Sequence, residues 1–317
     1  MSMQAYSDDQ LILAAQLYFL DGLSQAQVGK LVHVSQSKVS RMLALARDLG
    51  LVRVSVPEYE TRHLALESAL KRKLGIEAVV VRSLPGLRIK DVRQMLGYFA
   101  APIVARSIEP GARVAIAGGR TMQALAEHMK PSGVVPSVTF AQAMGHIDSS
   151  PGPYDAVELS RLLAKNWQGR FLTLNTPAIL PEPEICRRML GLDQIRGVLE
   201  QLAGADLALV GIGSLENPVF AEHRTLTPRD VDALRGAGAA GEILGRFFDA
   251  SGKECQTPLK RRVVSLGLNE LQQIPRIVGV LAGSDRTGAL LAAIRGGLLN
   301  ALVIDDRCAA TLVERVG

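Results

Sequence analysis

The stretch Leu207-Ala208-Leu209-Val210-Gly211-Ile212 decides the fold of most of this chain, because it is a short apolar run that ends at glycine. From Glu77 onward such runs alternate with segments long enough to form helices. The other runs are residues 78–81, 113–117, 137–141, 171–174, 277–281 and 301–304. Strands that are apolar throughout and separated by helices are typical of parallel sheets covered on both faces. The sequence therefore predicts a doubly wound, mostly parallel, Rossmann-like α/β domain.

The composition narrows the class of protein further. The 317 residues are enough for two domains, and with 48% hydrophobic and 21% charged residues the chain is neither disordered nor fibrous. It has no signal peptide and no apolar run near the roughly 20 residues that cross a bilayer, so we expect a cytoplasmic protein with no membrane partner. The cysteines are Cys186, Cys255 and Cys308, whose wide spacing predicts neither disulfides nor a zinc site. We expect no metal and no cofactor.

Residues 8–50 differ from the rest because they carry helical periodicity only. A first helix begins at Asp8 and ends near Gly22. Ser24 and Gln27 have the spacing of a capping box, which predicts a short second helix to Leu31. After a tight turn in which His33 stands where glycine is usual, Ser35 begins a third helix that Gly50 ends. Two helices joined by such a turn indicate a helix-turn-helix.

The third helix presents polar side chains at its start, where a recognition helix contacts bases and phosphates. The candidate DNA-binding residues are Ser35, Gln36, Ser37, Lys38, Ser40 and Arg41. Residues 51–56 alternate like a strand and predict a wing, from which Arg53 reaches the DNA backbone. We therefore expect a winged helix-turn-helix DNA-binding domain at residues 1–57; the alternative is a small helical bundle with a solvated polar edge.

The charge of this first domain is low for a DNA-binding module. Residues 1–57 hold five Lys and Arg against four Asp and Glu. Useful affinity for DNA then needs an oligomer that presents several such domains. After Pro57 a helix is expected in which His63, Leu66, Leu70 and Leu74 share one stripe, either packed on the second domain or forming a dimerisation seam.

The motifs together resemble one family. Residues 24–28, 35–43 and 50–53 look like the head of SorC-family transcriptional regulators, and residues 241–252 (GEILGRFFDASG) are similar to the family's most diagnostic stretch. Residues 274–276, 282–286, 293–297 and 302–306 continue the resemblance. It implies a phosphosugar-isomerase-like body at residues 58–317 that contains a linker helix, binds a phosphorylated sugar and oligomerises. It also implies a tetramer, operator DNA as partner, and control of a carbohydrate operon.

Three turns that leave strand ends are the expected effector site. Gly119, Arg120 and Thr121 open a helix, where free N–H groups and the helix dipole favour an anion. Gly213 and Ser214 in the second turn either line the pocket or serve packing alone. This turn is not a dinucleotide motif, because Glu216 stands where glycine is needed. Arg286 in the third turn stands where the family usually has a phosphate-binding lysine.

Two residues of the diagnostic stretch complete the candidate site. Asp249 resembles the family's acidic contact to sugar hydroxyls, although an Asp before Ser251-Gly252 also forms turns. Arg246 either pairs with Asp249 or faces the pocket.

An enzyme is the competing interpretation, namely a phosphosugar isomerase or deaminase fused to a DNA-binding head. Such chemistry needs a base beside the sugar and a proton relay. Residues 214–218 offer the single carboxylate of Glu216 and no histidine, so we expect no catalytic residues and no enzyme. A purely architectural DNA-binding protein would leave the long α/β body without a task.

Overall fold

The computed structural model describes residues 6–133, 137–215 and 225–316. These residues separate into two compact units, with the boundary in the sequence between Tyr59 and Glu60. Each unit is described by itself below.

The first unit is helical. Its elements are α1 (Asp8–Ala15), which continues into a π-helical turn η1 (Gln16–Leu20), α2 (Gln25–Leu31) and α3 (Gln36–Asp48). Ser24 and Gln27 form the predicted capping box on α2, and Ser35 caps α3 by accepting from the Lys38 N–H. His33 adopts the left-handed conformation expected in the turn, with φ of 53°.

The predicted wing is wrong. Residues 51–56 form no strand, and Val54 and Val56 are 65% and 78% exposed. A wing is a hairpin, and one alternating run supplies only one of its two strands. No partner for this run exists among the described residues, so the segment extends from α3 without a ladder. Arg53 lies on it, exposed.

The helix after Pro57 begins later than predicted, as α4 (Leu64–Leu74). Residues 61–63 first run along the edge of β1 (Glu77–Val81), where the His63 N–H donates to the Val80 carbonyl at 2.8 Å. Leu70 is fully buried, and Leu66 and Leu74 pack against the same core. Of the two interpretations of the leucine stripe, the structure shows packing on the body.

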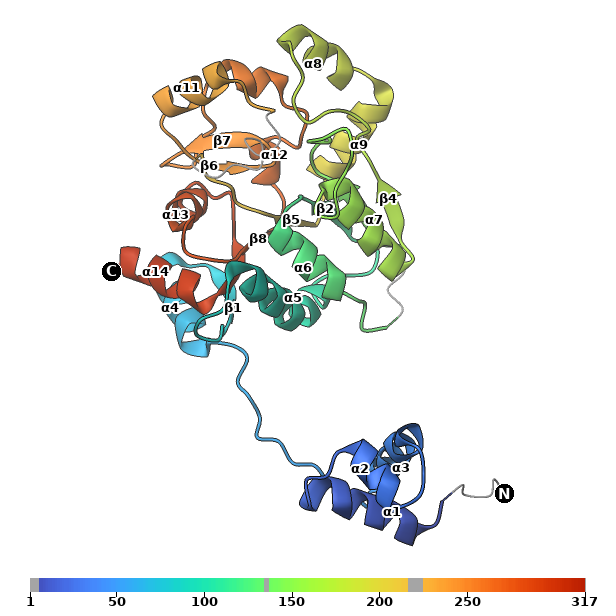
Figure 1. Cartoon of the computed structure of the whole chain (residues 1–317). Coiled ribbons are helices and arrows are strands. Elements are labelled where there is room, and N and C mark those ends of the chain that lie inside the picture. The colour runs from blue at the N-terminus through green and yellow to red at the C-terminus, as the bar shows by residue number, and fades with distance from the viewer. Residues whose placement is uncertain (1–5, 134–136, 216–224, 317) are drawn as a thin grey trace. The chain divides into compact units, whose positions relative to one another are not determined.

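The second unit confirms the predicted doubly wound sheet. In the described part of the chain seven parallel strands pair in the order β1-β9-β8-β5-β2-β3-β4 (Figure 1). The bounds of the other six are β2 (Arg113–Ile116), β3 (Thr139–Gln142), β4 (Arg170–Leu172), β5 (Leu207–Val210), β8 (Arg276–Leu281) and β9 (Ala301–Asp305).

Alternate side chains of each strand enter two different cores. Val114 and Ile116 of β2 face the core under α5 (Ile89–Ala105), α6 (Arg120–His128) and α7 (Ala156–Trp167). Ala115 faces the other core, to which α4 and a set of further helices contribute. That set is α9 (Asp193–Ala203), α11 (Pro228–Gly236), α12 (Leu268–Leu271), α13 (Thr287–Arg295) and α14 (Asp306–Arg315). Burial on both faces explains why the strands are apolar throughout.

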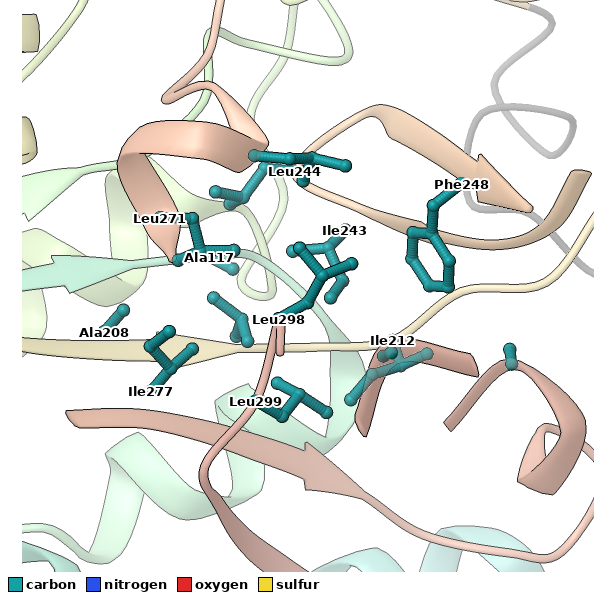
Figure 2. Close-up of a cluster of buried hydrophobic side chains, with 14 of the residues drawn as sticks. Ala117, Ala208, Ile212, Ile243, Leu244, Phe248, Leu271, Ile277, Leu298 and Leu299 are labelled. Carbon is teal, nitrogen blue, oxygen red and sulfur yellow. The ribbon is translucent and has the colours of Figure 1, made fainter. Parts of the chain in front are cut away.

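A two-stranded antiparallel hairpin lies over the second core. It consists of β6 (Ala239–Ile243) and β7 (Arg246–Asp249), and Figure 2 shows its Ile243 and Phe248 in one cluster with Ala208 and Ile277 of the large sheet. Leu244 and Gly245 turn the hairpin with φ of 56° and 77°, the two positive values that a tight hairpin turn requires. The remaining elements are α8 (Pro183–Leu190) and the 3₁₀ turn η2 (Pro258–Arg262).

Two helical glycines give a matched test of packing. A methyl group on Gly97 in α5 would overlap the Ala124 carbonyl and lie 2.9 Å from the Leu125 nitrogen of α6, whereas one on Gly197 in α9 would meet nothing within 4 Å. We expect Gly97→Ala to destabilise the protein by roughly 3 kcal/mol or more, because packed backbones cannot move apart cheaply. Gly197→Ala should be neutral or stabilising by up to about 1 kcal/mol. Thermal or urea unfolding measures both, and equal effects would contradict the close approach of α5 and α6.

Candidate functional site

The candidate site lies where the winding direction of the sheet reverses. β2 and β5 are neighbours, but the chain continues from β2 to β3 on one side and from β5 to β8 on the other. At such a point the turns after the two strands diverge and leave a crevice at the carboxyl edge of the sheet. A cavity of about 100 Å³ lies here, a size that favours a small metabolite over a dinucleotide.

The turn after β2 supplies the first wall of this cavity. Gly119 ends the turn with φ of 133° and its N–H donates to the Tyr154 carbonyl at 2.7 Å. Gly118, Gly119, Arg120 and Thr121 all line the cavity. The N-cap of α6 is Gly119, which has no side chain that could cap the helix, so the start of α6 forms part of the cavity wall. The Arg120 guanidinium lies 5.6 Å from the centre of the Tyr154 ring. The arrangement suits an anion.

Gly213 in the turn after β5 is required by its neighbour Glu242. The two residues pair as a short antiparallel bridge, with N–O distances of 2.9 and 3.1 Å. A methyl group on Gly213 would overlap the Glu242 carboxylate. Ser214 is buried beyond Gly213 and does not line the cavity, so the structure does not bring it to the site.

Arg286 supplies the third wall, directly before α13. Its Nη1 donates to the Ile212 carbonyl at 3.1 Å and its Nη2 to the Ala282 carbonyl at 3.2 Å. Its Nε lies 3.4 Å from a carboxylate oxygen of Asp285. The side chain is 17% exposed and therefore holds a positive charge between the ends of β5 and β8.

Glu242 lines the cavity, although the sequence did not single it out. Its side chain is buried at the cavity, and Oε1 accepts a 2.5 Å hydrogen bond from the Gly245 N–H. Burial raises the pKa of Glu242 to about 7, while the Gly245 hydrogen bond and the charge of Arg286 act against that rise. Its only sequence signal was its place beside Gly241 in the diagnostic stretch.

Other lining residues also escaped the sequence analysis. Arg93 of α5 lines the cavity, as do Tyr154 and Asp155 before α7. Seven apolar side chains also line the cavity, namely Ala117, Met122, Met144, Ile147, Ile212, Leu244 and Val280. Asp155 was detectable as the residue before a helix, whereas nothing in the pattern around Arg93 separates it from a solvated helix face.

Arg246 and Asp249 do not belong to this cavity, which corrects the sequence interpretation. Arg246 forms an ion pair with Glu254 at 2.9 Å and donates to the Leu266 carbonyl at 3.1 Å. Asp249 accepts from the Ser251 hydroxyl at 2.6 Å, and this bond contributes most to lowering the pKa of Asp249. The turn-forming interpretation of Asp249 holds, because its carboxylate is used by the backbone of the turn. Residues 216–218, which include Glu216, lie outside the described residues.

The first unit carries the candidate DNA surface. Six predicted residues are exposed at the start of α3, namely Ser35, Gln36, Ser37, Lys38, Ser40 and Arg41. Val39 between them is buried, so the polar residues share the outer face of the helix. Lys30 and His33 line the same groove as Gln36 and Lys38 and are further candidates for contact with DNA.

Comparison with known proteins identifies relatives of both units. The family model described as "Putative sugar-binding domain" matches residues 60–314. The transcriptional regulator LsrR of Enterobacter sp. (strain 638) is 28% identical, covering 99% of this chain and 95% of its own. The deoxyribonucleoside regulator of Bacillus subtilis (strain 168) is 29% identical, covering 96% of each chain.

A solved structure covers nearly the same length. The crystal structure of the full-length sorbitol operon regulator SorC from Klebsiella pneumoniae is similar with a TM-score of 0.73 and 26% identity. The match covers 97% of this chain and all of that one. These relatives are transcriptional regulators and not enzymes, which confirms the expectation that this chain is no enzyme.

The described residues hold neither a membrane-spanning helix nor a metal-binding cluster. Within residues 6–133, 137–215 and 225–316, no helix is both long and apolar enough to cross a membrane. The same residues contain no cluster of three or more His, Cys, Asp or Glu side chains that would hold a metal ion.

The raised pKa of Glu242 predicts a pH-dependent stability. The folded protein binds this proton more tightly than the unfolded chain, so the contribution to stability is full below about pH 4.5 and is lost as the pH rises to about 7. Glu242→Gln removes the ionisation and should spare the protein about 2 to 3 kcal/mol of that loss between about pH 5 and pH 8. Urea unfolding across this range measures it, with the exposed Glu200→Gln as control. Parallel profiles for Glu242→Gln and the unaltered protein would disprove the assignment.

Proposed function

This chain belongs to the SorC/DeoR family of sugar-binding transcriptional regulators, and we propose that its effector is a phosphorylated sugar or related metabolite. In this proposal residues 1–57 bind operator DNA, and residues 58–317 bind the effector and form the oligomer. Effector binding changes the affinity for an operator that controls carbohydrate genes.

The observation that carries the proposal is the meeting of a helix start and a held arginine in one cavity. The N-terminus of α6 and the Arg286 guanidinium both line it, although they come from turns far apart in the sequence. A phosphate accepts from backbone N–H groups and from a guanidinium at the same time. We assign the phosphate to Gly119, Arg120, Thr121 and Arg286.

The sugar part of the effector is assigned to Glu242 and to the apolar side chains of the same cavity. Glu242 offers a carboxyl group with one oxygen occupied by the Gly245 N–H, and the absence of a side chain on Gly213 leaves room for the other oxygen. A carboxylate accepts from sugar hydroxyls, and the apolar wall of Met144, Ile147 and Leu244 suits the carbon skeleton.

The DNA-binding part of the proposal rests on the exposed start of α3. Five positive against four negative side chains in residues 1–57 give a weak electrostatic footprint for one copy. Two copies on neighbouring half-sites multiply the affinity, so we propose a homo-oligomer, as a tetramer of two dimers. Such a regulator works in the cytoplasm, where the DNA is.

A thermal-shift panel tests the effector class. Hexose and pentose phosphates are compared with their free sugars, since a ligand that binds only the folded state adds RT ln(1 + [L]/Kd) to stability. We expect only phosphorylated members to raise the melting temperature. At a hundredfold excess over Kd, such a ligand adds about 2.7 kcal/mol to the free energy of unfolding. Equal shifts from free sugars would remove the phosphate assignment.

Separate substitutions test the two binding functions independently. Lys38→Ala or Arg41→Ala should weaken operator binding by about tenfold, since each removes one contact of roughly 1 to 2 kcal/mol, and should leave effector affinity unchanged. Arg286→Ala should lower effector affinity at least tenfold and leave operator binding without effector unchanged. The exposed Lys165→Ala and Arg196→Ala are the charge-matched controls. An Arg286→Ala variant with full effector affinity would refute the assignment.

A further inference from the structure

Three consecutive residues at the junction of β9 and α14 together hold two different parts of the second unit. These residues are Asp305, Asp306 and Arg307. Their side chains bond the turn that carries Arg286 and the segment that follows β1. The cavity therefore has a continuous connection, through hydrogen bonds, to the edge strand of the sheet.

The first bond joins the junction to the cavity. Oδ2 of Asp305 accepts from the Gly283 N–H at 2.6 Å, and Oδ1 caps α14 by accepting from the Arg307 and Cys308 N–H groups. Asp305 is 1% exposed, so its carboxylate is held from both sides in a site without water competition. Gly283 begins the turn that ends at Arg286. A shift of that turn would move the Gly283 N–H and, with it, the Asp305 carboxylate to which it donates.

The second set of bonds joins the junction to the end of β1. Oδ1 of Asp306 accepts from the Ser83 hydroxyl at 2.6 Å and from the Ser83 N–H at 3.1 Å. Nη2 of Arg307 donates to the Leu84 carbonyl at 3.0 Å. The two residues after Arg82 are thus fixed by the residues next to Asp305.

The third set joins the end of β1 to the entry of the chain into this unit. The Arg82 N–H donates to the Thr61 carbonyl at 2.9 Å, and its Nε donates to the Arg62 carbonyl at 3.1 Å. Glu67 accepts from the Val80 N–H at 2.9 Å and from two nitrogens of Arg62 at 2.9 and 2.5 Å. Residues 61–63 are among the first of the second unit, so the chain enters the second unit from the DNA-binding unit through these residues.

We propose that Asp305, Asp306 and Arg307 couple the effector cavity to residues 61–63 and so transmit effector binding to the DNA-binding unit. This rests on the proposed function. Closure of the Gly283–Arg286 turn on a phosphate moves the Asp305 carboxylate. The neighbouring Asp306 and Arg307 carry the shift to Ser83 and Leu84, and the attachment of residues 61–63 to β1 then differs between the empty and the occupied protein. Asp306, Ser83 and Glu67 are positioning residues, since none of them lines the cavity.

The test compares Ser83→Ala and Asp306→Ala with Asp193→Ala. Asp193 is the first residue of α9, as Asp306 is of α14, so the control loses the same favourable charge at a helix start. The probe ligand is the panel phosphate with the largest thermal shift, and the DNA is a genomic fragment selected by the unaltered protein. Calorimetry measures effector affinity, and fluorescence anisotropy measures operator affinity with and without effector.

We expect Ser83→Ala and Asp306→Ala to bind the effector and the free operator within about threefold of the unaltered protein. The effector-induced change in operator affinity should fall at least fivefold, because the substitutions break the hydrogen bonds that join the two sites and leave each site intact. By reciprocity the effect of operator DNA on effector affinity should fall by the same factor. A merely structural role would lower stability and leave this ratio unchanged, as Asp193→Ala should.

Two results would overturn the proposal in distinguishable ways. An unaltered protein that binds no phosphorylated sugar, or whose DNA affinity ignores it, refutes the proposed function and the coupling with it. An unaltered protein that responds, together with variants that respond equally, refutes the coupling alone.

Glu67→Gln keeps an acceptor for the Val80 N–H and loses the charge that holds Arg62, so it tests the entry side of the same connection. If the effector-induced change in operator affinity were the same in Glu67→Gln as in the unaltered protein, residues 61–63 would not be part of the coupling.

Discussion

The parallel direction of the strands is the constraint from which the rest of the second unit follows. The strands pack against helices on both faces of the sheet, so each must be reached by a crossover that covers one face with a helix. All strands then end at the same edge, and the turns that leave them gather there. The reversal between β2 and β5 opens a crevice at that edge, into which the turns carrying Gly119 and Gly213 project. The position of the site therefore follows from the strand order of the sheet and does not depend on which side chains line it.

Side chains at the crevice then give this opening the character of the proposed anion site. Glycine is needed at position 213 because the Glu242 carboxylate occupies the space of a side chain. Leu244 holds a left-handed conformation that costs a leucine energy, and its side chain lines the cavity. The β6–β7 hairpin therefore supplies both the acidic group and part of the apolar wall. Its strained turn lies at the cavity, where such strain is commonly kept for function.

The sequence was sufficient to predict the sheet and the helix-turn-helix, because both depend on local patterns. Short apolar runs separated by helix-length segments predicted the parallel strands, and the Ser24–Gln27 pair predicted the start of α2. The wing failed because residues 51–56 alternate correctly but have no second strand to pair with. Whether a strand forms depends on a partner, which a run of residues does not reveal.

The candidate site was predictable only where it follows strand ends. Gly119, Arg120, Thr121, Gly213 and Arg286 were found because each belongs to a turn that leaves a strand. Glu242 and Arg93 were missed because they reach the cavity from a hairpin and a helix, whose approach to the sheet is a tertiary property. Arg246 and Asp249 were misplaced for the converse reason. They share a sequence motif with Glu242, but on β7 they point to Glu254 and to the following turn.

Arginine at position 286 changes what the site demands of its ligand. Two of its nitrogens are held by the Ile212 and Ala282 carbonyls, which come from the ends of two neighbouring strands. A lysine has a single nitrogen on a flexible stem and would follow its ligand, whereas this guanidinium is held in one plane by the sheet. In the proposed function, the effector therefore brings its anionic group to the arginine. A ligand that succeeds pulls on the ends of β5 and β8 at once, and the Gly283 N–H that Asp305 holds lies one residue beyond Ala282. The same rigidity that makes the site selective makes it a suitable origin for a signal.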